Sequence, residues 1–204
     1  MKMSNTVLIK TYSAPPVDRA EILRYAGVKE RSPEIDALLE DCLREYEGKI
    51  QYRICYTELS VKVCGDEIDL SFAKVGSHSL ALNLSGCERV ILFCATIGAE
   101  ADRIISKYSY LSPSREAMLG AIGSERVEAL CDAFCDDVRE AFASDSCSVR
   151  PRFSPGYGDL SIDLQADIFR AIDPAKRIGV FLNESMMMSP SKSVTAIIGI
   201  KKDK

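Results

Sequence analysis

Hydrophobic residues in the first fifty positions recur with the period of an α-helix. They predict a helix over 16–26, which Gly27 ends. A second helix is predicted behind Ser32 and Pro33, a capping residue followed by proline at the first helical position. Its apolar face is formed by Ile35, Leu38, Leu39, Cys42, Leu43 and Tyr46. Gly48 closes this helix.

From residue 50 the hydrophobic period changes to two, which predicts strands. Alternating segments cover 50–56 and 59–63, and Gly65 with Asp66 marks a turn into a return strand over 68–70. The alternation of Leu80, Leu82 and Leu84 predicts another strand. The apolar run over 89–96 is nearly continuous, which is typical of a central strand covered on both faces.

The second half of the chain predicts more helices and a closing pair of strands. A helix is expected over 101–108, and a long one after Pro113, interrupted near Gly120 and Gly123. A loop over 144–159 precedes a helix over 164–172, and strands are expected over 178–182 and 194–200. This order predicts a single α+β domain over residues 1–204, with a largely antiparallel, twisted sheet flanked by helices.

Composition narrows the possible functions. The 204 residues carry a net charge of -4, with scattered lysines and arginines, so we expect no nucleic-acid partner. The longest apolar run, over 90–97, is too short to span a bilayer, so we expect no membrane partner and a cytoplasmic location. The one histidine, His78, excludes a metal site built on several imidazoles and leaves little room for a histidine-based catalytic triad.

The eight cysteines lack the spacing of a zinc ribbon or a redox motif, because no two of them are separated by two residues. Cys131 and Cys135 lie one helical turn apart, but Val138 stands where a radical iron–sulfur enzyme needs its third cysteine. We therefore expect small, buried, apolar cysteines and no metal ligands, with a cluster assembled from distant cysteines as the alternative.

Two stretches carry possible binding chemistry. In 152–159, Arg152 can pair with a carboxylate, a Pro-Gly turn can bring backbone groups close to a ligand, and Tyr157 offers a ring face. The alternative is an ordinary surface turn. In 183–190, three consecutive methionines indicate either a flexible plug under a loop or an adaptable apolar wall for a flat ligand or a partner.

The chain resembles the stand-alone form of the activation domain of cobalamin-dependent methionine synthase. The likeness runs over about 90–200 and keeps the family's order of motifs. Arg152 with Gly156 and Tyr157 matches the signature loop, and the helix over 128–137 resembles the family's acidic helix, in which the acidic ligand residue aligns with Asp132. Further matches are Ala95 to Gly98 with Asp102, Glu184, Ser185, Met188, Pro190, Ser193 and Val194.

The resemblance implies the fold and function of that family. Its domain binds S-adenosylmethionine and presents it to cobalamin. When this cobalamin has fallen to the inactive Co(II) state, one electron, usually from a flavodoxin, produces Co(I), which takes the methyl group from the bound sulfonium. The chain would then be an accessory subunit of a methyltransferase in methionine biosynthesis. It would act in trans on a methionine synthase or related corrinoid protein that carries the cobalamin.

The resemblance also implies roles for particular residues, none of them catalytic. Arg152 would pair with the methionine carboxylate, and Asp132 would face the ammonium or sulfonium charge. The remaining site residues would line the ligand or shape the floor beneath it, and they are Ser154, Pro155, Gly156, Tyr157, Glu184 and Ser185.

The chain departs from the family pattern in three places, and the departures at Gly158 and Ile198 keep a second hypothesis open. Gly158 replaces a family proline, which suggests a looser loop, and Ile198-Gly199 stands where an aromatic pair is expected. The family's N-terminal aspartate has no counterpart that the sequence places. The chain could therefore be a non-catalytic module that docks on a corrinoid protein without binding S-adenosylmethionine. A free-standing enzyme for a small substrate ranks third, because the sequence offers no acid–base pair.

Overall fold

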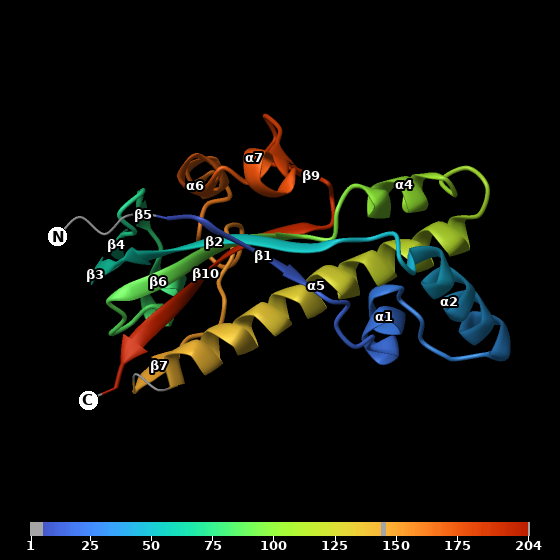
Figure 1. Cartoon of the computed structure of the whole chain (residues 1–204), viewed down its shortest axis with the longest axis horizontal. Helices are drawn as coiled ribbons and strands as arrows, with labels where there is room; N and C mark the ends of the chain where they lie inside the picture. The colour runs from blue at the N-terminus through green and yellow to red at the C-terminus, as the bar shows by residue number, and fades with distance from the viewer. Residues whose placement is uncertain (1–5, 144–145, 204) are drawn as a thin grey trace.

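A five-stranded antiparallel sheet forms the centre of the computed structural model, which describes residues 6–143 and 146–203 (Figure 1). In spatial order its strands are β1 (Leu8–Tyr12), β2 (Tyr52–Ser60), β6 (Arg89–Thr96), β10 (Ser193–Lys202) and β7 (Cys147–Val149). Strand β6 lies in the middle, as its apolar run predicts, and pairs with β2 and β10 along its whole length. The predicted α+β class with an antiparallel sheet flanked by helices is confirmed.

Helices cover one face of this sheet (Figure 1). They are α1 (Arg19–Tyr25), α2 (Pro33–Tyr46) and α5 (Pro113–Ala143), and α4 (Glu100–Ser106) packs on α2 and α5. The core on this side contains Phe93 of β6 and Phe134 of α5, whose ring centroids lie 5.0 Å apart. No helix within the described ranges is long and apolar enough to cross a membrane.

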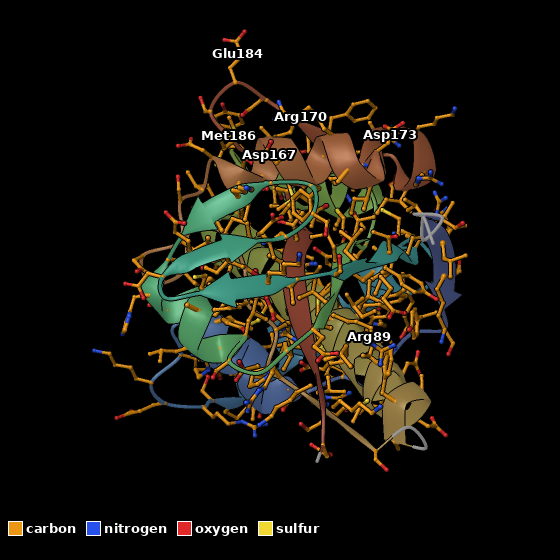
Figure 2. The ribbon with its side chains drawn as sticks, turned by 90° about the vertical axis from the view of Figure 1, so that its left-hand side faces the viewer. Arg89, Asp167, Arg170, Asp173, Glu184 and Met186 are labelled. Carbon is orange, nitrogen blue, oxygen red and sulfur yellow. The ribbon has the colours of Figure 1, made fainter. Side chains whose placement is uncertain are left out.

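The opposite face carries smaller elements (Figures 1 and 2). They are α3 (His78–Asn83), α6 (Leu164–Ile172), α7 (Pro174–Ile178), the sheet β3 (Lys62–Cys64), β4 (Glu67–Asp69) and β5 (Lys74–Gly76), and the hairpin β8 (Phe181–Leu182) with β9 (Met188–Ser189). Alternate residues of β6 enter the two cores, Phe93 on the α5 side and Leu92 on the α6 side. This explains why β6 is apolar at nearly every position.

Two sequence predictions are wrong in the middle of the chain. Leu80, Leu82 and Leu84 do not form a strand: Leu80 and Leu82 lie in helix α3, which Leu84 ends. Ser77 caps this helix, since its Oγ accepts from the N–H of Leu80 at 3.1 Å. The predicted interruption of the long helix is also absent, because α5 is helical through both glycines. Gly123 instead leaves room for a side chain of a neighbouring segment, Lys192, to pass close to the helix.

The remaining differences concern short elements. The predicted loop over 144–159 contains β7, which pairs with the end of β10, while Ser144 and Asp145 lie outside the described residues. The predicted strand over 178–182 is only two residues long, because Ile178 ends α7. The predicted strand over 59–63 is divided between β2 and β3, and β1 was not predicted.

Candidate functional site

Arg152 is the charged centre of the candidate site. Its neighbour Phe153 is tied to β10: the Phe153 N–H donates to the carbonyl of Ile197 at 2.8 Å, and the Phe153 carbonyl accepts from the N–H of Ile197 at 2.9 Å. This pairing fixes the backbone and directs the arginine side chain toward α5. There the guanidinium forms ion pairs with Glu128 and Asp132, and 25% of the Arg152 side chain is exposed.

A cavity of about 440 Å³, here called the Arg152 pocket, lies beside this arginine. Helices α5 and α6, the arginine loop, β9 and β10 contribute its walls. Its volume lies within the range of small-ligand sites. The lining residues are Glu128, Arg152, Phe153, Ser154, Pro155, Tyr157, Gln165, Met188, Ser193, Val194 and Thr195.

The loop that forms one wall of this pocket is held by its own backbone. Gly156 adopts φ +89°, and its N–H donates to the carbonyl of Leu160 at 2.9 Å. The N–H of Leu160 in turn donates to the carbonyl of Tyr157 at 3.0 Å. The Tyr157 side chain is 69% exposed at the rim of the pocket. These hydrogen bonds fix the backbone of the loop.

Gly158 suits the left-handed backbone of this loop, and its neighbour Asp159 ties the loop to α3. The φ of Gly158 is +55°, whereas proline is fixed near −65°, so a proline is incompatible with this backbone. A Cβ at 158 would also lie 2.8 Å from Ser79 Oγ. The adjacent Asp159 carboxylate accepts from Ser77 Oγ at 2.6 Å and from the N–H of His78 at 2.7 Å. The hydrogen bond from Ser77, with those from the backbone of α3, holds the pKa of Asp159 well below its usual range.

A second cavity, of about 490 Å³, opens on the other side of Arg152 and is here called the acidic cavity. Arg152 and Glu128 line both cavities. The other residues that line the acidic cavity are Pro15, Pro16, Asp18, Glu21, Tyr25, Glu125, Ala129, Asp132, Ala133 and Asp136. The N–H of Asp18 donates to Glu125 at 2.9 Å. The structure therefore brings an N-terminal aspartate, Asp18, into the same cavity as Asp132.

Neither a protein-family model nor a curated protein sequence matches this chain. A solved structure, the MetH reactivation domain bound to AdoHcy, superimposes on 98% of this chain and 80% of its own length, with a TM-score of 0.68 and 16% sequence identity. This chain has the fold of the MetH reactivation domain. The fold expected from the resemblance is thereby confirmed.

Within this MetH reactivation fold, the predicted site residues divide into two groups. Arg152, Ser154, Pro155 and Tyr157 line the Arg152 pocket, Gly156 shapes its loop, and Asp132 reaches it through the ion pair with Arg152. Glu184 and Ser185 instead belong to the turn between β8 and β9, and neither lines the pocket. Figure 2 shows Glu184 at the tip of this turn, pointing away from the rest of the chain.

The methionine run contributes one residue to the pocket. Met188 lies in its wall, while Met187 is 64% exposed, and its N–H donates to the Asn183 side chain at 2.9 Å. Ile198, where an aromatic residue was expected, is fully buried in the core on the α5 side and cannot reach a ligand.

The polar residues of the pocket that sequence reasoning missed include Glu128 and Gln165. Glu128 lies four residues before Asp132 on α5, so helical spacing placed both on one face. Gln165 is three and seven residues before the apolar Ile168 and Ile172 of α6. A polar residue on the apolar face of α6 was therefore the sequence signal that could have identified Gln165.

The cysteines are consistent with an apolar role. Within residues 6–143 and 146–203, no group of three or more histidine, cysteine or acidic side chains could hold a metal ion. Six cysteines are buried; Cys64 is exposed and Cys147 partly so. Burial raises the pKa of the Cys131 and Cys94 thiols well above the ordinary value, which keeps both protonated.

A larger cavity, of about 640 Å³, lies between α2 and the sheet, where β1 ends at Tyr12 and β2 begins at Tyr52. Among the arginines that line it, Arg126 pairs with Glu125 and Arg19 with Glu40, each with a single carboxylate, whereas Arg152 pairs with two. We place the candidate site at Arg152, because converging charges border the cavities there.

Proposed function

We propose that the chain binds S-adenosylmethionine in the Arg152 pocket and presents its methyl group to the cobalamin of a methionine synthase, or a related corrinoid protein, acting in trans. The observation that carries this proposal is the position of Arg152 between Glu128 and Asp132 at the edge of the pocket. A cation flanked by carboxylates complements the carboxylate and ammonium of an amino acid. The AdoHcy bound by the solved MetH reactivation domain, the product of methyl donation, supports the choice of ligand.

The exposure of the two acidic side chains indicates which of them the ligand carboxylate would replace at Arg152. Asp132 is 69% exposed, and an ion pair at such a position contributes about 0–1 kcal/mol. Glu128 is half as exposed, at 36%, and lines the pocket. The ligand carboxylate would displace Asp132 from Arg152, and Glu128 would remain. The released Asp132 then faces the ligand ammonium, so Arg152 keeps two carboxylate partners and Asp132 keeps a cationic one.

The loop over 154–157 would position the rest of the ligand. Backbone hydrogen bonds restrict this loop, which reduces the entropy lost on binding. Pro155 and the Tyr157 ring provide apolar contacts, and Gly156 permits a close approach of the backbone. Glu184 and Ser185 would reach the ligand only through a movement of the β8–β9 turn.

The chemistry asks little of the chain itself. Bound S-adenosylmethionine supplies an electrophilic methyl carbon and leaves as a neutral thioether, so the chain needs no general base. Its residues would bind and orient the donor, which is how positioning accelerates a reaction. The cobalamin and the electron donor, such as a flavodoxin, would come from other proteins of the cytoplasm.

Calorimetric titration with S-adenosylmethionine and S-adenosylhomocysteine tests the site. We expect Arg152→Met to lower the affinity for both ligands by at least about tenfold, because it removes a charge-assisted hydrogen-bond donor. The matched control is Arg139→Met, which removes another arginine whose partner, Asp136, is also acidic and on α5. If the folded wild-type chain binds neither ligand, even beside a corrinoid protein, the proposal is wrong.

Transfer of an isotopically labelled methyl group to a reduced corrinoid protein tests the activity. The proposal requires the label on the corrinoid and its loss in Arg152→Met. Capture of the corrinoid protein without any binding of S-adenosylmethionine would instead identify an interaction module.

A further inference from the structure

Gln165 is a buried polar residue in the wall of the Arg152 pocket. It lies in the first turn of α6 and is 5% exposed. Its Nε2 donates to the carbonyl of Met186 at 3.3 Å. Its Oε1 is shielded from solvent and has no hydrogen-bond partner among the described residues. Such orphaned acceptors are uncommon and destabilise a fold, so this one calls for an explanation.

The position of this carboxamide points to a ligand. An apolar residue of the same shape would fill the space without leaving an acceptor unpaired. Met188 and Phe153 supply apolar surface in the same pocket, and the charged groups that line it are Arg152 and Glu128. A ligand that places its charged end at Arg152 leaves its neutral part for the surface around Gln165.

We propose that Gln165 reads the adenine base of the ligand. A carboxamide has an acceptor and a donor on one edge, and adenine presents the complementary pair in its exocyclic amino group and N7. Oε1 would accept from the amino group, and the second N–H of Nε2 would donate to the ring nitrogen, while the first stays on Met186. The terminal torsion of glutamine is soft, so the carboxamide can turn toward the base. A ribose hydroxyl would use only one of these two groups. This inference rests on the proposed function for the identity of the ligand.

The test compares S-adenosylhomocysteine with S-inosylhomocysteine, in which an oxygen replaces the amino group and the donor is lost. We expect the wild-type chain to prefer the adenine compound by about tenfold in calorimetry. Gln165→Met should bind the adenine compound about tenfold more weakly than the wild-type chain does, and it should bind both compounds equally. The control is Gln51→Met, at an exposed glutamine outside the pocket, which should keep the preference.

Other outcomes separate the possible failures. If the wild-type chain binds both compounds equally, the role of Gln165 is refuted and the proposed function stands. If Gln165→Met weakens both compounds by the same factor and lowers the melting temperature, its role is structural, and the inference is also refuted. If the wild-type chain binds neither compound, the proposed function itself fails.

Discussion

Replacement of Arg126 by methionine should destabilise this fold more than the loss of any exposed arginine. Arg126 and Glu125 form an ion pair whose side chains are only 3% and 4% exposed. The Arg126 guanidinium also donates to the carbonyls of Pro15 and Pro16, each at 2.7 Å. It thereby fastens the segment before α1 to α5.

The structure sets the size of the effect. In Arg126→Met, Glu125 stays buried with one described donor, the N–H of Asp18, and both proline carbonyls lose their partner. Removal of one partner from a buried ion pair costs about 3–5 kcal/mol. A domain of this length loses about 2–4 °C of melting temperature per kcal/mol, so we expect a fall of roughly 10 °C.

Calorimetry and urea unfolding measure this loss, with Arg103→Met as the control. Arg103 also pairs with a glutamate at 3.0 Å, but 76% of its side chain is exposed, so its loss should cost less than about 1 kcal/mol. The double variant Glu125→Leu/Arg126→Met removes both charges and should recover part of the stability. If Arg126→Met melts no lower than the control, the buried pair does not hold the segment as argued.

Three further predictions concern other parts of the chain. Gly199→Ala should destabilise by about 1–3 kcal/mol in urea unfolding, since its Cβ would lie 2.7 Å from Leu84, whereas Gly120→Ala, with open space on α5, should stabilise by about 0.5–1 kcal/mol. Because hydrogen bonds lower the pKa of Asp159, its ionised form stabilises the fold above its unfolded pKa of about 4 and loses this contribution at lower pH; urea unfolding of Asp159→Asn should show a deficit at neutral pH that closes in acid. A thiol reagent should modify the exposed Cys64 first and reach Cys94 only on unfolding, and a fast phase that persists in Cys64→Ser would contradict this order.

The parts of the fold that the sequence predicts are those with strong hydrophobic periodicity. Strand β6 and helix α2 bury regular positions and were found at nearly their observed bounds. Strand β1 was missed because it is an edge strand with mostly exposed residues, so it shows no alternation. In α3 the local alternation of leucines is typical of a strand, whereas the cap at Ser77 is the signal that indicates a helix.

For the site, the sequence predicts the ligand loop but not the contacts that this loop makes with distant parts of the chain. Arginine, proline and glycine mark 152–158 as a possible ligand loop. The anchoring of Asp159 to Ser77 and to α3 joins positions about 80 residues apart, and no local pattern encodes such a contact. The orphaned oxygen of Gln165 likewise depends on packing between α6 and the β8–β9 turn.

One face of α5 links the stability of the fold to the proposed binding site. Glu128 and Asp132 lie three and seven residues after Glu125 on α5. The glutamate of the buried pair and both partners of Arg152 therefore follow each other along one helix face. The segment held by Arg126 forms the opposite wall of the acidic cavity. We therefore expect Arg126→Met to lower the affinity for S-adenosylmethionine at a temperature where the variant is folded, although Arg126 lies outside the Arg152 pocket. Gly199→Ala disturbs the contact of β10 with Leu84 and should reduce stability while it leaves ligand affinity unchanged. Equal losses of affinity in the two variants would show that binding follows global stability and not the α5 face.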